Sequence, residues 1–223
     1  MTLSRFLVFV GLALAVTVAT GFVGVAVVYA GQLPPLNAKK WIHAGFTGGW
    51  FLLFVVQAGL ARRHLRLHRR LGVASLLVAA GVIATGVSVA SGRYLRWGPG
   101  DGEEGALGLF LMYLLQFALF YSIALLRRRD SELHGRFLLF AGLSLAPPAT
   151  DRITAAFGTP HAVSPALVAL FVLLLVGYDL VRWRRPHRAT LLGVCLLVVT
   201  SFVGHWVAGS ATWAETVRAW LPA

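Results

Sequence analysis

The chain has 223 residues, of which 58% are hydrophobic and only 13% are charged. A soluble domain carries about 25% charged and about 45–50% apolar residues, so this composition excludes an ordinary water-soluble fold. The formal net charge is +12, but the basic residues lie between long apolar runs and not on one face of a domain, which excludes nucleic acid and indicates a lipid bilayer as the partner.

Seven apolar segments are long enough to cross a bilayer, which takes about 20 residues of helix. They are residues 6–30, 41–61, 71–91, 106–126, 137–157, 163–181 and 189–209. The first is too long for the apolar core of a signal peptide, which has about 7–15 residues. The sequence therefore predicts an all-α polytopic membrane protein, with a seven-helix transmembrane domain over residues 1–210.

The positions of the arginines predict the orientation of the spans. Thirteen of the 20 lysines and arginines lie in the connections 62–70, 127–136 and 182–188. These three connections alternate along the chain, so they share one side of the membrane, and basic connections face the cytoplasm. We expect a multi-pass protein of the inner (cytoplasmic) membrane, with the N-terminus in the cytoplasm and the C-terminus outside.

Residues 211–223 are predicted to form a short amphipathic helix after the last span. The large apolar residues share one helical face, at i, i+4, i+7 and i+8: Trp213, Val217, Trp220 and Leu221. Thr212 and Glu215 match the capping box at a helix start. Because tryptophans favour the membrane–water boundary, this helix is expected to lie in the outer interface.

The stretch APPATDR (146–152) interrupts the fifth predicted span. Pro147 and Pro148 remove two helical N–H donors, so the helix should kink or break there. Asp151 and Arg152 follow at membrane depth, either as an Asp–Arg arrangement whose charged ends reach the interface or as part of a polar pocket. The candidate lining of this outer polar pocket is His43, Trp50, Gln57, Asp151 and Arg152, with His161 and His205 in the same outer layer.

Histidines begin the third, fifth and seventh spans at the arginine-rich side: His68, His134 and His187. Three imidazoles at one depth are enough for a metal ion such as zinc with an open coordination position. Asp179, near the end of the sixth span, is a candidate fourth ligand or a residue that orients a ligand. The alternative is that these are ordinary interfacial histidines with no shared site.

Two other histidine patterns allow further hypotheses. His187 and His205 are 18 residues apart, or about 27 Å along one helical face, so haem b near either membrane surface is possible with facing histidines as axial ligands. The usual di-haem spacing of two ligands on one helix is missing. His64 and His68 have the i, i+4 spacing of metal-binding helices, but the adjacent histidine pairs of membrane di-iron enzymes do not occur in this sequence.

The stretch HAGFTGGWFLLFVVQAGLARRHLRLHRRLG (43–72) resembles a family of small, uncharacterised bacterial multi-pass membrane proteins. The resemblance continues through LHGRFLLFAGLSLAPPATDR (133–152) and YDLVRWRRPHRATLLG (178–193), and so extends over nearly the whole chain. The family pattern falls on His43, Trp50, Gln57, His68, Arg69, His134, Arg152, Asp179 and His187, but not on His205. The resemblance implies the seven-helix fold and no particular activity.

Three functions remain open from the sequence. The first is a redox or cofactor protein that holds a divalent metal or haem at the cytoplasmic face. The second is an accessory membrane subunit, or a carrier of a small molecule such as a quinone, that uses the outer pocket. The third is a zinc-dependent membrane hydrolase, by analogy with other seven-helix enzymes that place paired histidines in their last span, a spacing that this chain lacks.

Overall fold

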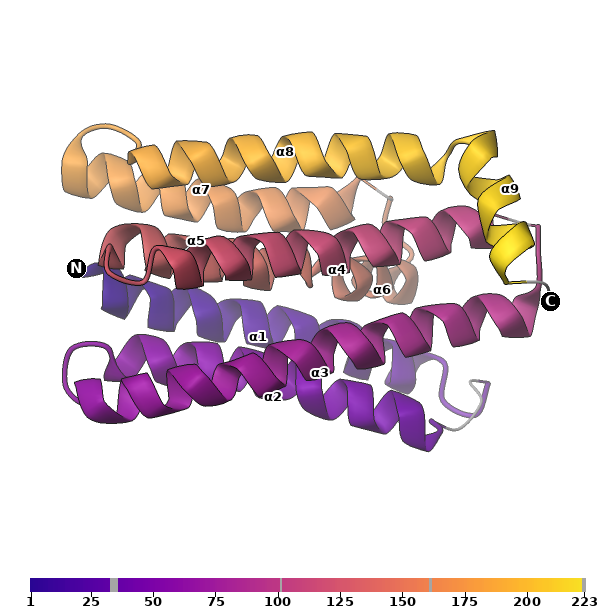
Figure 1. Cartoon of the computed structure of the whole chain (residues 1–223), viewed down its shortest axis with the longest axis horizontal. Helices are drawn as coiled ribbons and strands as arrows, with labels where there is room; N and C mark the ends of the chain where they lie inside the picture. The colour runs from indigo at the N-terminus through magenta and orange to yellow at the C-terminus, as the bar shows by residue number, and fades with distance from the viewer. Residues whose placement is uncertain (33–35, 101, 161, 222–223) are drawn as a thin grey trace.

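The computed structural model describes residues 1–32, 36–100, 102–160 and 162–221, and these ranges form nine helices and no strand. The helices are α1 (Leu3–Val28), α2 (Ala38–Leu60), α3 (Leu65–Trp97), α4 (Glu103–Leu126), α5 (Ser131–Ser144), α6 (Pro147–Phe157), α7 (Val163–Trp183), α8 (Arg188–Ala208) and α9 (Ala211–Trp220). The predicted all-α class is confirmed. The long helices run side by side as an elongated bundle (Figure 1).

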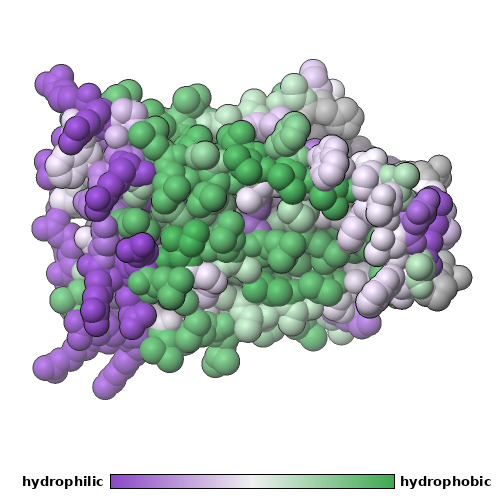
Figure 2. Space-filling view, turned by 45° about the horizontal axis from the view of Figure 1, so that its top comes forward, coloured by the Kyte–Doolittle hydropathy of each residue, from purple (hydrophilic) through white to green (hydrophobic). Residues whose placement is uncertain are grey.

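Six of the helices are long and apolar enough to cross a membrane: α1, α2, α3, α4, α7 and α8. Apolar side chains cover the middle of the molecule, and hydrophilic ones gather at one end (Figure 2). Leucines and valines such as Leu77, Val181 and Val198 lie exposed on this surface. Since exposed apolar side chains on this scale need an apolar solvent, the surface indicates a bilayer around the bundle.

The fifth predicted span, 137–157, is divided between two helices. α5 ends at Ser144 and α6 begins at Pro147, so the predicted break is confirmed. Pro147 and Pro148 occupy the first turn of α6, where an α-helix has no use for their missing N–H groups. Neither α5 nor α6 alone has the length of a spanning helix.

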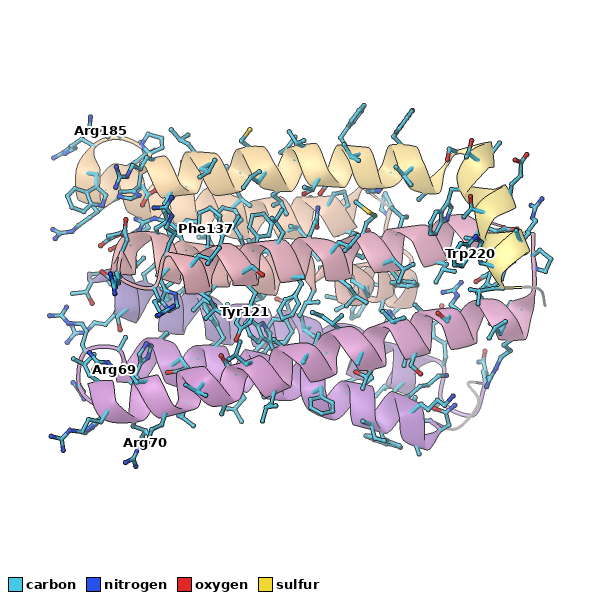
Figure 3. All side chains as sticks on the ribbon, viewed as in Figure 1. Arg69, Arg70, Tyr121, Phe137, Arg185 and Trp220 are labelled. Atoms are coloured by element: carbon cyan, nitrogen blue, oxygen red, sulfur yellow. The ribbon has the colours of Figure 1, made fainter. Side chains whose placement is uncertain are left out.

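The two chain ends lie at opposite ends of the bundle (Figure 1). The N-terminus shares its end with the α2–α3, α4–α5 and α7–α8 connections, which together with the helix turns beside them hold most of the arginines. Figure 3 shows Arg69, Arg70 and Arg185 at this end and Trp220 at the other. We call it the arginine end.

The core lies where α1, α2, α4 and α5 meet, and it is rich in aromatic rings. Phe117, Phe120, Phe137 and Phe140 are fully buried. α1 approaches α6 so closely that a Cβ on Gly21 would lie 2.2 Å from the backbone oxygen of Ala149. This contact holds the second half of the broken helix against the bundle.

The C-terminal helix α9 packs across the ends of α3 and α4 that lie opposite the arginine end. Val217 is buried in a small cluster with Ala90, Tyr94 and Leu107, while Trp220 is 82% exposed. The predicted Thr212–Glu215 capping box is wrong: Ser210 is the N-cap, and its hydroxyl accepts from the backbone N–H of Trp213. Helix α9 starts two residues earlier than that capping box implies, because Ser210 is itself a good cap.

Candidate functional site

Two helical hairpins place a histidine at the same position at the arginine end. His68 is the fourth residue of α3, and His134 is the fourth residue of α5. The preceding helix of each hairpin, α2 or α4, ends only a few residues earlier, so its last carbonyl groups face the first turn of the next helix. The second helix of each hairpin begins with one of two similar stretches of sequence, LHRRLG (67–72) and LHGRFL (133–138).

Each of these histidines donates its Nδ1–H to a backbone carbonyl of the preceding helix. The Nδ1–oxygen distance is 3.2 Å from His68 to Gln57 and 2.8 Å from His134 to Ala124. A carbonyl only accepts, so this bond assigns the proton of the neutral ring to Nδ1 and leaves the Nε2 lone pair free. Metal-binding histidines are oriented in the same way, through a hydrogen bond from their second nitrogen.

The two imidazoles are neighbours in space. Their ring centroids are 6.4 Å apart, and the ring planes are nearly perpendicular, at 84°. Burial lowers the pKa of His134, the hydrogen bond to Ala124 raises it, and the proximity of His68 lowers it further. The net lowering favours the neutral imidazole, which is the form that binds metals.

Gln57 completes this local arrangement. Its Nε2 donates to the backbone oxygen of His68 at 3.0 Å, while its own backbone oxygen accepts from the His68 ring. Because a carbonyl partner requires the NH₂ group there, Oε1 is the remaining atom, and it is buried with no hydrogen-bond partner among the described residues. Gln57 therefore lies beside His68, near the end of α2 opposite to His43.

His187 and Asp179 belong to a different group, between α7 and α8. Asp179 accepts from the backbone N–H of His187, at 2.9 Å, and from the hydroxyl of Thr190, at 2.5 Å. His187 is the N-cap of α8, and its Nδ1 accepts from the backbone N–H of Ala189. Asp179 is thus fully occupied by protein donors.

A buried arginine is the centre of that second group. Arg136 and Asp179 are both fully buried and paired at 2.5 Å. The same guanidinium donates to Thr190, at 3.0 Å, and to the backbone oxygen and carboxylate of Glu132. Within the described ranges, no three His, Cys, Asp or Glu side chains are arranged to hold a metal ion, so the structure does not support the predicted set of His68, His134, His187 and Asp179 as one site.

Polar side chains continue from the histidine pair into the bundle. The hydroxyls of Ser75 on α3 and Tyr121 on α4 are 2.6 Å apart, and the Trp50 ring on α2 packs against Tyr121 with centroids 5.2 Å apart (Figure 3). The indole Nε1–H of Trp50 is buried without an acceptor in the described part of the chain. Trp50 thus lies buried between α2 and α4.

The remaining outer residues that the structure describes each have hydrogen-bond or ring partners of their own, and among them Arg152 is close enough to His43 to act on it electrostatically. His43 bonds Thr85 through Nδ1 at 3.0 Å, Asp151 is exposed and accepts from Ser164, and the Arg152 guanidinium contacts the Phe22 ring and the backbone oxygen of Pro148. His205 is exposed and bonds its own helix at Ser201. His161 lies outside the described residues.

Two buried polar residues were missed from the sequence. Arg136 was assigned to a basic connection, and Gln116, which donates to Thr200 at 2.8 Å and to Ser201 at 2.9 Å, was not considered. A signal was available for the interior face of α2: His43, Trp50 and Gln57 are spaced by seven residues, the period of a helix face that packs against neighbours.

No family model matches the chain, and neither a curated protein nor a solved structure matches it.

Proposed function

We propose that this protein binds a transition-metal centre at the arginine end, through the Nε2 atoms of His68 and His134. The centre is a divalent ion such as zinc, or the iron of a haem. Imidazole nitrogens suit zinc, copper, iron and nickel, and histidine is a common axial ligand of haem. The protein would thus serve as a membrane-embedded cofactor protein.

The proposal is supported by side-chain atoms that carry a free electron pair and have no hydrogen-bond donor as a partner among the described residues. His68 and His134 keep free Nε2 lone pairs, because their Nδ1 protons are committed to Gln57 and Ala124. Gln57, which bonds both the backbone and the ring of His68, has a buried Oε1 that has no donor among the described residues. An unpaired buried acceptor costs about 1–3 kcal/mol, and a cation bound between the two rings would give the imidazole nitrogens a partner.

The proposal also includes a topology. In it α5 and α6 together make one crossing, which gives seven crossings with α1–α4, α7 and α8. The N- and C-termini at opposite ends of the bundle support an odd number (Figure 1). The arginine end would face the cytoplasm by the positive-inside rule, so that the metal site lies at the cytoplasmic boundary of an inner membrane.

The test is elemental analysis and an absorption spectrum of the full chain purified in detergent. We expect about one equivalent of a transition metal, or a Soret band if the centre is haem. His68→Ala and His134→Ala should each abolish it, and Gln57→Leu should weaken metal affinity by about 10–100-fold, the usual effect of losing a group that orients a ligand. His64→Ala is the matched control, since His64 is an exposed histidine one turn before His68.

Two results would overturn the proposal. One is a protein that stays free of metal and haem after expression with supplemented metals and haem precursor, and that binds none on titration. The other is stoichiometric binding that survives both histidine substitutions.

A second candidate function is supported by Trp50. Its buried Nε1–H lacks an acceptor among the described residues, and a carbonyl oxygen, such as that of a quinone, would accept from it. In that case the protein is a small-molecule carrier or accessory subunit. Trp50→Phe, which keeps the aromatic packing, should then abolish quinone binding and leave the metal content unchanged.

A further inference from the structure

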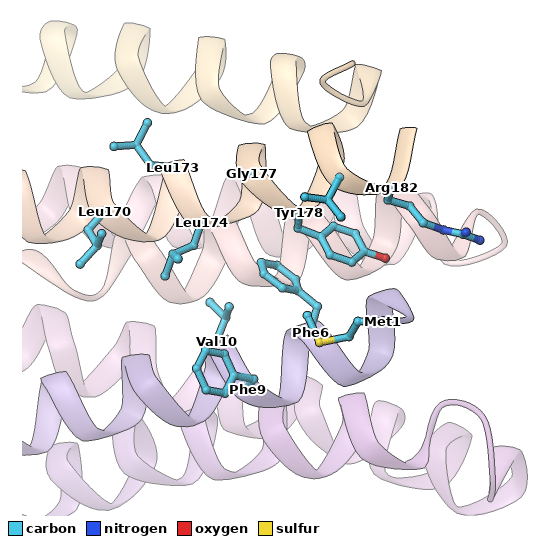
Figure 4. A pocket seen from close by; sticks show the side chains of 11 residues that line it. Met1, Phe6, Phe9, Val10, Leu170, Leu173, Leu174, Gly177, Tyr178 and Arg182 are labelled. Carbon is cyan, nitrogen blue, oxygen red and sulfur yellow. The ribbon is translucent and has the colours of Figure 1, made fainter. Parts of the chain in front are cut away.

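The arginine end of the bundle carries a groove between α1 and α7, on the side of α1 that faces away from α2. Its volume is about 670 Å³, within the range of about 300–1,000 Å³ for small-molecule sites. Apolar side chains line most of it: Phe6, Phe9 and Val10 from α1, and Leu170, Leu173 and Leu174 from α7 (Figure 4).

The polar atoms of the groove are concentrated at its arginine end. Tyr178 and Arg182 lie there, one turn apart on α7, while Leu170 lies at the other extreme (Figure 4). The Tyr178 ring stacks on Phe6, with centroids 4.5 Å apart, which fixes the ring in the wall. Arg182 is exposed and forms no ion pair with the carboxylates of the described residues.

The dimensions of the groove match one leaflet of a bilayer. From Leu170 to Arg182, α7 rises about 18 Å, at about 1.5 Å per residue. Half of the hydrocarbon core of a bilayer is about 15 Å thick. A chain that lies in the groove with its polar end at Arg182 would therefore begin at the membrane surface and end near the midplane.

We propose that this groove binds one acyl chain of an anionic phospholipid, with the phosphate at Arg182 and the Tyr178 hydroxyl. The apolar wall matches a hydrocarbon chain, and the unpaired guanidinium favours a headgroup of net negative charge over a zwitterionic one, whose own cation offsets its phosphate. Basic residues near a membrane surface attract anionic lipids by about 1 kcal/mol each. The site is separate from the His68–His134 pair, and it does not depend on whether that pair binds a metal.

Native mass spectrometry of the full chain tests the proposal by titration with palmitoyl-oleoyl phosphatidylglycerol and with the matching phosphatidylcholine. We expect the first phosphatidylglycerol molecule to bind about fivefold more tightly than the first phosphatidylcholine molecule. An attraction of about 1 kcal/mol per basic residue corresponds to this ratio of dissociation constants. Arg182→Gln should remove this preference. Arg185→Gln, an exposed arginine of the same connection that does not line the groove, should keep it.

Gly177→Phe tests the apolar part of the site. Gly177 lines the groove, and a Cβ built there meets no atom within 4 Å, so a side chain can leave the helix at this position without a clash at its first atom. It should weaken the first binding step for both lipids at an unchanged melting temperature. Equal losses of preference in Arg182→Gln and Arg185→Gln would overturn the proposal, because the preference would then belong to the whole arginine end. Unchanged lipid binding in Gly177→Phe would also overturn it.

Discussion

The buried Arg136–Asp179 pair gives the sharpest prediction about stability. Both side chains are fully buried, and they join α5 to α7, with Thr190 bringing in α8. Arg136→Met removes the guanidinium and keeps an unbranched apolar chain of similar length. It leaves the Asp179 carboxylate buried, with the Thr190 hydroxyl and the His187 N–H as its only remaining donors among the described residues.

The expected loss follows from the buried charge. Breaking a buried ion pair by removing one partner costs about 3–5 kcal/mol, since the other charge is left uncompensated. For a chain of this length, that corresponds to a fall in melting temperature of roughly 6–20 °C. Replacing both partners, as in Arg136→Met with Asp179→Leu, removes both charges, and such replacements are often neutral.

The double variant should not recover completely. Thr190 and the backbone N–H of His187 lose their acceptor when Asp179 is replaced, at about 1 kcal/mol for each hydrogen bond. We therefore expect the double variant to lie within about 2 kcal/mol of the wild type and to be more stable than Arg136→Met.

Fluorescence-detected size-exclusion melting in one detergent measures these differences, with Arg185→Met as the control for an exposed arginine at the same end. The reasoning is refuted if Arg136→Met melts within the range of Arg185→Met. It is also refuted if the double variant melts below Arg136→Met, because the charges would then not be the source of the loss.

Two further predictions concern the α1–α6 contact and the first turn of α8. Gly21→Ala should destabilise the fold by about 1–3 kcal/mol, because its Cβ would overlap the backbone oxygen of Ala149. Gly24→Ala is the control: its Cβ meets no atom within 4 Å, so it should be neutral or stabilising in the same melting assay. Burial and the charge of Arg136 lower the pKa of His187, so the stability that neutral His187 contributes is complete above its unfolded pKa of about 6.5 and is lost as the pH falls through the lower pKa of the folded state. His187→Asn keeps an N-cap and should flatten the dependence of melting temperature on pH between pH 7 and 5. An unchanged dependence on pH would contradict this.

Much of the fold could be predicted because membrane helices leave a strong, local signal in sequence. An apolar run of about 20 residues is sufficient by itself, and six of the seven segments coincide with helices of spanning character. The break at Pro147 was also predictable, because proline acts on its own backbone. The start of α9 was not, since Ser210 and Thr212 are both good caps and only packing against α4 selects between them.

The site was less predictable because it depends on which helices meet. His68 and His134 share a depth with His187, but depth does not determine the neighbours around the bundle. His187 was grouped with them because it begins the seventh predicted span, yet it caps α8 and does not occupy the fourth position of a helix. Arg136 resembled any other loop arginine, and only its pairing with Asp179 across two helices explains its burial.

The two similar stretches at the starts of α3 and α5 differ at the residue after histidine, and the difference follows from packing. In LHRRLG this residue is Arg69, which is exposed, whereas in LHGRFL it is Gly135, where a Cβ would lie 2.7 Å from Leu7 of α1. Helix α1 thus covers one hairpin and leaves the same position of the other open. The histidines of both hairpins nevertheless keep the same hydrogen bond to the preceding helix. A geometry retained in two hairpins with such different surroundings is better explained by a shared role for the imidazoles than by the packing of either helix, and loss of metal in His68→Ala and His134→Ala alike is the result that this explanation requires.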